Sequence, residues 1–129
     1  MQDNILFSKI PSKVPKIDKG LFALMKKKVL GEEYDLSIAF VGKKEIKNLN
    51  DQFRKIDLPT DILSFPLDKN SGEIIFCFDE VKRKSELFGK TPIQYLNYLF
   101  IHGLLHLKGM EHSSKMEAKE KLLCKIFAI

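Results

Sequence analysis

The residues most able to do chemistry in this chain are its three histidines, which all lie in one short stretch. His102 and His106 are four residues apart, so their rings would lie one turn apart on the same face of a helix. Gly109 can adopt the left-handed conformation that ends a helix, and the turn would bring His112 back toward the other two. Three neutral imidazoles around an open fourth position are the ligand set of a catalytic zinc site. The spacing therefore predicts a metal site.

Histidine alone is weak evidence, because a single histidine near an apolar helix usually has a structural role. All three histidines of the chain in one window, with a glycine where the chain must turn, are a much stronger signal. Three histidines suit zinc and would also suit nickel or copper. Cys77 and Cys124 are far apart and in no ligand spacing, so we expect them to be reduced, buried and without a chemical role.

A metal at this site would polarise a water molecule and lower its pKa toward neutrality, for attack on a phosphodiester, an amide or an ester. The stretch is similar to the metalloprotease motif H-E-x-x-H, but Gly103 stands where that motif has its general-base glutamate. Glu111 is an alternative carboxylate, although a solvated turn residue is its commoner role. A glycine within a helix costs about 1 kcal/mol relative to alanine. Gly103 therefore indicates either close packing or room beside the metal.

The charge balance favours a phosphate-containing substrate. The net charge is +5, and of the 22 basic residues only Arg54 and Arg83 are arginine. A guanidinium group can bind two phosphate oxygens at once and stabilise negative charge in a transition state. Arg54 is therefore our candidate catalytic residue, and a surface salt bridge explains it equally well. Asp61 is a candidate hydrogen-bond partner for a ligating imidazole, or equally a turn or cap residue.

The elements that must position these side chains follow from the hydrophobic pattern. Strands are predicted at residues 5–7, 34–41, 60–65 and 73–78, with Pro66 closing the third and a hairpin joining the last two. Helices are predicted at residues 17–30, 43–53, 79–87, 92–108 and from residue 114 onward. The fourth helix is apolar nearly all round and should be buried centrally. This order predicts an α+β fold, a small mixed four-stranded sheet packed with about five helices.

Helix ends are predicted from capping residues. Asp79 is expected to cap the third helix, and Thr91 with the proline after it to open the fourth. Ser114 and Glu117 form a capping-box pattern at the start of the last helix. Five apolar residues of that segment are expected to face inward: Met116, Leu122, Leu123, Ile126 and Phe127.

Chain length and hydropathy predict one soluble domain. At 129 residues the chain is long enough for one core and short for two, so we expect a single domain over residues 1–129. No apolar run approaches the roughly 18 to 20 residues of a membrane span. The N-terminus has no basic region followed by an apolar stretch, as a secretory signal would. We therefore expect a cytoplasmic protein.

Three segments of the chain, residues 50–66, 72–74 and 101–112, together resemble the YbeY family of bacterial metal-dependent endoribonucleases. The string H-G-x-L-H-L-x-G-x-x-H in the third segment is highly specific. The resemblance implies one zinc ion per chain on a zincin-like helix, bound by His102, His106 and His112, with Arg54 near the active cleft. It implies cleavage of single-stranded RNA in 16S rRNA 3′-end maturation and ribosome quality control. The implied partners are an rRNA precursor and the small ribosomal subunit.

Two positions depart from the family pattern. Glu111 stands where the family usually has aspartate before the third histidine, and Glu73 where it usually has aspartate in the hairpin. Both substitutions keep a negative charge, so we expect the metal site to persist. The alternative function is a non-catalytic RNA- or ribosome-binding assembly factor with a structural metal. A metal-dependent amidase or peptidase is disfavoured because Gly103 replaces the usual base.

Overall fold

The computed structural model describes residues 4–8 and 10–129 of the chain, and within them the pattern forms four strands and five helices. In chain order these are β1 (Ile5–Phe7), α1 (Lys19–Leu30), β2 (Asp35–Phe40), α2 (Lys43–Arg54), β3 (Ile62–Asp68), β4 (Ser71–Phe76), α3 (Phe78–Leu87), α4 (Pro92–Leu107) and α5 (Ser114–Ile126). The predicted α+β class with a mixed sheet is confirmed. Within the described part of the chain, no helix has the length and apolar character needed to cross a membrane.

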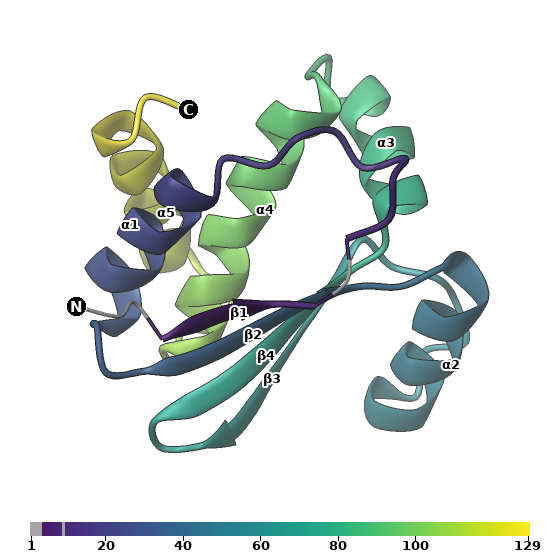
Figure 1. Ribbon diagram of the computed structural model, residues 1–129, viewed down its shortest axis with the longest axis horizontal. Helices are drawn as coiled ribbons and strands as arrows, with labels where there is room; N and C mark the ends of the chain where they lie inside the picture. The colour runs from purple at the N-terminus through teal and green to yellow at the C-terminus, as the bar shows by residue number, and fades with distance from the viewer. Residues whose placement is uncertain (1–3, 9) are drawn as a thin grey trace.

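The sheet has the strand order β1-β2-β4-β3 and divides the apolar residues into two groups. β2 runs parallel to β1 and β4, and the hairpin sets β3 antiparallel to β4, so that β3 is an edge strand. Successive side chains of a strand point to opposite faces. Accordingly, Ile74 belongs to the large core under α1, α3, α4 and α5, whereas Ile75 packs with Ile46 of α2 on the other face. Figure 1 shows α2 standing apart from the other four helices.

Helix α4 is the central buried helix, as predicted. Thr91 caps its first turn: the Thr91 hydroxyl accepts from the Gln94 backbone N–H at 3.2 Å, and the Gln94 side chain accepts from the Thr91 backbone N–H at 2.9 Å. Midway along the helix, Gly103 allows α4 to lie against the sheet, because a Cβ there would be 2.9 Å from Ile62 Cδ1 and 3.0 Å from Ser64 Oγ. Close packing, rather than room beside a metal, therefore explains this glycine.

Several predicted element boundaries were wrong, among them the end of β4, which stops at Phe76 because Phe78 begins α3. β3 does not stop before Pro66 but continues to Asp68, with Pro66 paired to Gly72. An edge strand tolerates proline, since one side of it has no ladder partner, and the register shifts just after this residue. Cys77, not Asp79, is the N-cap of α3. Asp79 lies instead in the first turn, where the helix dipole favours an acidic side chain.

The last helix also differs from its prediction. Its N-cap is Ser113, one residue earlier than expected, and the Ser113 hydroxyl accepts from the backbone N–H of Met116 at 3.2 Å. Leu122 and Ile126 do not face inward, because their relative exposures are 50% and 51%. Met116 and Leu123 are buried as predicted. Only a narrow stripe of α5 therefore packs onto the core.

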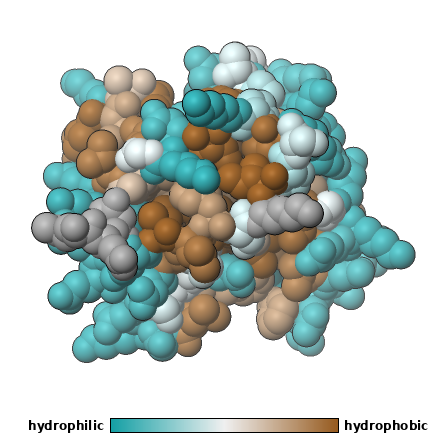
Figure 2. Space-filling view, viewed as in Figure 1, coloured by the Kyte–Doolittle hydropathy of each residue, from teal (hydrophilic) through white to brown (hydrophobic). Residues whose placement is uncertain are grey.

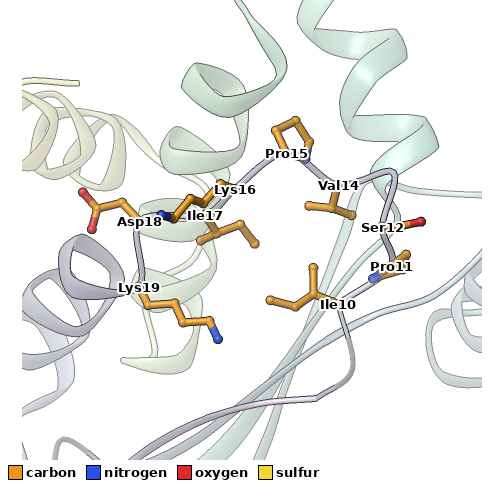
Figure 3. Close-up of a pocket in the computed structure, with 9 residues that line it drawn as sticks. All are labelled: Ile10, Pro11, Ser12, Val14, Pro15, Lys16, Ile17, Asp18 and Lys19. Carbon is orange, nitrogen blue, oxygen red and sulfur yellow. The ribbon is translucent and has the colours of Figure 1, made fainter.

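The connection between β1 and α1 encloses a hollow of about 900 Å³. Ile10, Val14 and Ile17 point into the space that the segment surrounds (Figure 3). From the same side as Figure 1, apolar side chains fill the middle of this face between hydrophilic ones (Figure 2). The described lining residues include no histidine and no arginine, so this hollow lacks the side chains expected to do chemistry.

Candidate metal centre

The structure brings the three histidines together at one end of α4. The Nε2 atoms of His102 and His106 lie 3.1 Å apart, as expected for residues one turn apart on a helix. His112 lies in the connection to α5, and one ring nitrogen of each histidine falls within 4.8 Å of the others. Two histidines on a rigid helix and one on a turn therefore form a cluster of three donors.

The turn that returns His112 is a Schellman motif centred on Gly109. The backbone N–H of Met110 donates to the carbonyl of Leu105 at 3.0 Å, and that of Gly109 donates to the carbonyl of His106 at 2.9 Å. Gly109 has a φ of 100°, which a residue with a Cβ adopts only with strain. The same turn aims the Met110 carbonyl at the His106 ring, whose Nδ1–H donates to it at 3.1 Å. Gly109 thus serves two of the three histidines.

The other helical histidine is oriented by a carboxylate that the sequence did not single out. His102 Nδ1 donates to Oε2 of Glu120, a residue of α5 whose relative exposure is only 6%. The helical spacing of Glu120 from Met116 and Leu123 in the sequence could have indicated that it lies on the same buried face of α5. Asp61, our candidate for this role, has other partners. A buried glutamate, rather than this aspartate, supports the histidine cluster.

The donor set fits a metal ion. With each Nδ1 atom donating to an oxygen, the Nε2 atom of a neutral imidazole is left as an electron-pair donor, and the two Nε2 atoms, 3.1 Å apart, could both bind one cation. Two nitrogen ligands of a tetrahedral zinc lie about 3.3 Å apart. Burial, followed by the neighbouring His102 and His112, holds the pKa of His106 below its ordinary value. His106 is therefore neutral at pH 7, as a metal ligand must be.

The histidines line a cavity of about 590 Å³ at the edge of the sheet. Its other lining residues come from the end of α2, from β3 and from the two residues before β3: Phe53, Arg54, Thr60, Asp61, Ile62, Ser64 and Phe65. Arg54 is the last residue of α2, and no described carboxylate forms an ion pair with it. Among the described residues, the salt-bridge explanation of Arg54 thus lacks a partner. Arg54 and the three histidines therefore line one cavity beside β3.

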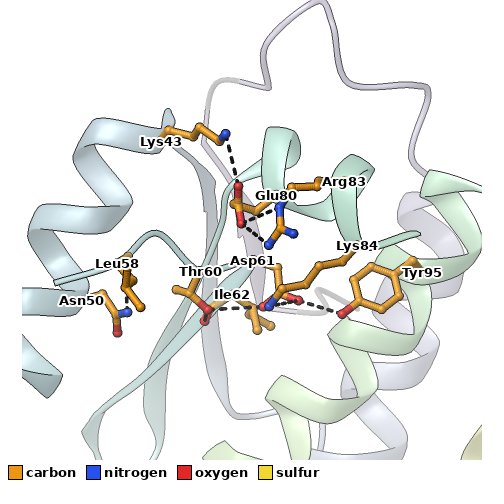
Figure 4. Close-up of polar contacts among 10 residues, drawn as sticks. All are labelled: Lys43, Asn50, Leu58, Thr60, Asp61, Ile62, Glu80, Arg83, Lys84 and Tyr95. Atoms are coloured by element: carbon orange, nitrogen blue, oxygen red, sulfur yellow. Dashed lines mark hydrogen bonds and ion pairs between the residues drawn. The ribbon is translucent and has the colours of Figure 1, made fainter. Parts of the chain in front are cut away.

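The end of α2 that presents Arg54 is held in place by its neighbours. Lys55 follows in the left-handed conformation with a φ of 57°, and its backbone N–H donates to the carbonyl of Asp51 at 3.0 Å. The buried side chain of Asn50 donates from Nδ2 to the carbonyl of Leu58 at 2.9 Å, as Figure 4 shows. These contacts fix the path of the chain on both sides of Arg54.

A family model described as Endoribonuclease YbeY matches residues 8–125 of the chain. The chain belongs to the endoribonuclease YbeY family. Proteins named Endoribonuclease YbeY from Staphylococcus epidermidis and Bdellovibrio bacteriovorus are 35% and 41% identical to it, over 118 and 103 residues. These matches cover 81% and 75% of this chain, and 76% and 69% of the relatives. The solution structure of a Thermotoga maritima protein, 35% identical, has a TM-score of 0.66 over 95% of this chain and 87% of that one.

The predicted resemblance to the YbeY family is therefore confirmed, and the departures at the two glutamates do not disturb the cluster. Glu111 is exposed and does not line the described cavity. Glu73 lies in β4 opposite Phe65, where the strand pairing is regular. Neither residue lines the cavity that the three histidines share.

In this YbeY-family chain, the second arginine has a structural partner. Arg83 binds the buried carboxylate of Glu80 at 2.9 Å, and Lys43 approaches the same group at 3.4 Å (Figure 4). The hydrogen bond from Arg83 keeps the pKa of Glu80 below its ordinary value. Beside this pair, Asp61 accepts from the hydroxyl of Tyr95 at 2.8 Å.

Lys84 also approaches Asp61, at 3.4 Å, so the aspartate has charged and hydrogen-bonding partners of its own although it lines the cavity. Burial and the nearby Asp61 carboxylate raise the pKa of Tyr95, which remains a hydrogen-bond donor at neutral pH. The network ties the start of β3 to α3 and α4. Of the two arginines, Arg54 alone is left without a carboxylate among the described residues.

Proposed function

We propose that this chain is a metal-dependent endoribonuclease that hydrolyses phosphodiester bonds of single-stranded RNA. Residues 1–129 would form one YbeY-like endoribonuclease domain, with one zinc ion held by His102, His106 and His112. The observation that carries the proposal is the shared cavity of three convergent imidazoles and an arginine that forms no ion pair with a described carboxylate. Membership of the endoribonuclease YbeY family supports RNA as the substrate.

The residues of the chain divide the work between holding the metal and holding the phosphate. When bound, the metal supplies a Lewis acid and a water of lowered pKa. Glu120 and the Met110 carbonyl fix the tautomers of His102 and His106, so that both Nε2 atoms are available as donors. Arg54 binds the scissile phosphate and stabilises the negative charge that grows on its oxygens during attack.

We further propose a role in 16S rRNA 3′-end maturation and ribosome quality control in the cytoplasm. The substrate would be an rRNA precursor, met on the small ribosomal subunit. The family and the net charge of +5 support a polyanionic partner of this kind. Zinc is favoured over nickel or copper because three neutral imidazoles around an open position are the usual catalytic zinc set.

The proposal is tested by incubating the metal-loaded protein with a ribosomal RNA precursor. We expect His106→Ala to lose both metal and cleavage, and Arg54→Ala to keep metal, fold and RNA binding while losing cleavage. Lys44→Ala, which removes a charge from the same helix outside the cavity, is the matched control. Elemental analysis reports the metal in each variant. If His106→Ala cuts as fast as wild type, the activity does not belong to this site.

The alternative, an assembly factor with a structural metal, is disfavoured by the open geometry. His112 is exposed, and among the described residues the donor cluster consists of three histidines. A structural zinc site usually has four protein ligands. Wild-type protein that binds metal and RNA but does not cleave would favour this alternative.

A further inference from the structure

Phe53 is a large apolar side chain that the fold leaves in solvent beside the candidate metal centre. Its relative exposure is 57%, and it lines the same cavity as Arg54 and the three histidines. Single exposed apolar residues are ordinary on protein surfaces. Phe53 differs from the others because it is aromatic and stands at the wall of the cavity where the RNA is proposed to bind.

A second aromatic residue, Phe65, packs against the ring of Phe53. The ring centroids of Phe53 and Phe65 lie 5.1 Å apart with an interplanar angle of 64°, an edge-on arrangement. Phe65 belongs to β3 and packs against the small core under α2, around Ile46 and Ile75. The phenyl ring of Phe53 is therefore supported on one side and free on the side that faces solvent.

Phe53 and Arg54 are placed so that they can contact two different parts of one RNA segment. Successive residues of a helix project about 100° apart, so a ring and a guanidinium group in sequence can contact different parts of one ligand. Both side chains line the same cavity, and the end of α2 is fixed by Asn50 and Lys55. The arginine is suited to a phosphate, and the phenyl face to an apolar, planar group.

We propose that Phe53 stacks on a nucleobase next to the phosphate held by Arg54, and that this contact selects single-stranded RNA. The proposal rests on the endoribonuclease function proposed above. Every base has a π face, so stacking on the Phe53 ring would bind RNA with little sequence preference. In the interior of a duplex both faces of a base are covered by its neighbours, so along a strand only an unpaired, unstacked base can lie on Phe53.

The test measures cleavage of a single-stranded oligoribonucleotide by the metal-loaded protein. Stacking on one aromatic side chain contributes about 1–3 kcal/mol, so Phe53→Ala should raise KM about 5- to 150-fold. Phe53→Tyr should restore the wild-type KM, whereas Phe53→Leu, which keeps apolar bulk without a π face, should not. Binding of a blunt duplex of the same sequence should change less than about twofold.

Phe88→Ala is a matched control. Phe88 is 63% exposed and its ring stacks on another aromatic residue, Tyr95, at 5.7 Å, but it does not line the cavity. Its removal should leave KM unchanged. A second measurement uses substrates with one abasic nucleotide at each position around the cut. At the stacked position, the abasic substrate and Phe53→Ala should weaken binding by the same factor and not add.

The outcomes separate this inference from the proposed function. Wild-type protein that binds metal but cuts no RNA contradicts the proposed function itself. If wild type cuts and Phe53→Ala has the same KM, or Phe53→Leu restores it, base stacking is wrong while the nuclease stands. An exposed Phe53 that instead docks a protein partner would give that result.

Discussion

Glu120 offers the sharpest test of how the histidine cluster is built. Its carboxylate accepts a hydrogen bond from His102 Nδ1 and is 6% exposed. Glu120→Gln keeps the shape of the side chain and removes its charge, which weakens the donor strength of the His102 Nε2 lone pair. Mutation of such a supporting partner typically lowers metal affinity about 10- to 100-fold. That corresponds to about 1.4–2.7 kcal/mol of binding free energy.

The assay is a competition titration of zinc between the protein and a chelator of known affinity, at pH 7. Glu120→Ala should weaken binding further, because His102 Nδ1 then has no oxygen to donate to. Glu117→Gln removes the same charge from the exposed side of the same helix and should bind zinc like wild type. Circular dichroism of the metal-free proteins checks that α5 is retained.

If Glu120→Gln binds zinc within about twofold of wild type while its fold is intact, the Glu120 carboxylate does not strengthen His102 as a ligand. In that case the contact between α4 and α5 is a packing contact, and the orientation of His102 comes from the helix alone. Equal weakening by Glu117→Gln would also contradict this role of Glu120, since a general charge effect would then explain both variants.

Three further predictions concern stability. Gly103→Ala should lower the free energy of unfolding by up to about 2 kcal/mol in urea titrations. Overpacking against Ile62 costs about 1–3 kcal/mol, and the better helix propensity of alanine offsets about 1 kcal/mol of it. A more stable variant would mean that α4 does not pack closely on the sheet at this position. The pKa of His106 is lowered in the fold, so the unfolded chain binds more protons than the folded protein as pH falls below about 6.5. The metal-free protein should therefore lose stability there, by at most about 1.4 kcal/mol per pH unit. His106→Ala should flatten this dependence of stability on pH, and an unchanged dependence would assign it to other groups. Tyr95→Phe should cost about 1.5–3 kcal/mol, measured by thermal unfolding, because it removes a hydrogen bond to the Asp61 carboxylate. A wild-type Tm would show that Lys84 and Thr60 satisfy Asp61 without it.

The proximity of the histidines was predictable because it is encoded locally. A four-residue spacing on an apolar helix and a glycine at its end require no knowledge of distant contacts, and the Schellman turn at Gly109 forms as expected. The long apolar run around His102 likewise predicted a buried central helix. Local rules of helix geometry therefore accounted for the heart of the candidate site.

The supporting residues were not predictable from local pattern, because they depend on how elements pack. Choosing Glu120 over Asp61 requires knowing that α5 lies along α4, while Asp61 turns toward Tyr95 and Lys84. The exposure of Leu122 depends in the same way on how narrow that contact is. Arg54 and Arg83 looked alike in sequence, and only the buried Glu80 beside Arg83 distinguishes them.

The narrow attachment of α5 makes the last helix and the histidine cluster one cooperative unit. Met116 and Leu123 are its only buried apolar side chains in the described chain, and Glu120 reaches the cluster between them. A ligand that binds only the assembled cluster also stabilises the docked helix, by mass action. Local opening of α5 should therefore be rarer when metal is bound, which slower amide hydrogen exchange in this helix would reveal. Exchange at the same rate with and without metal would show that the cluster survives undocking. The chain thus couples the readiness of its candidate active site to the folding of its own C-terminal segment.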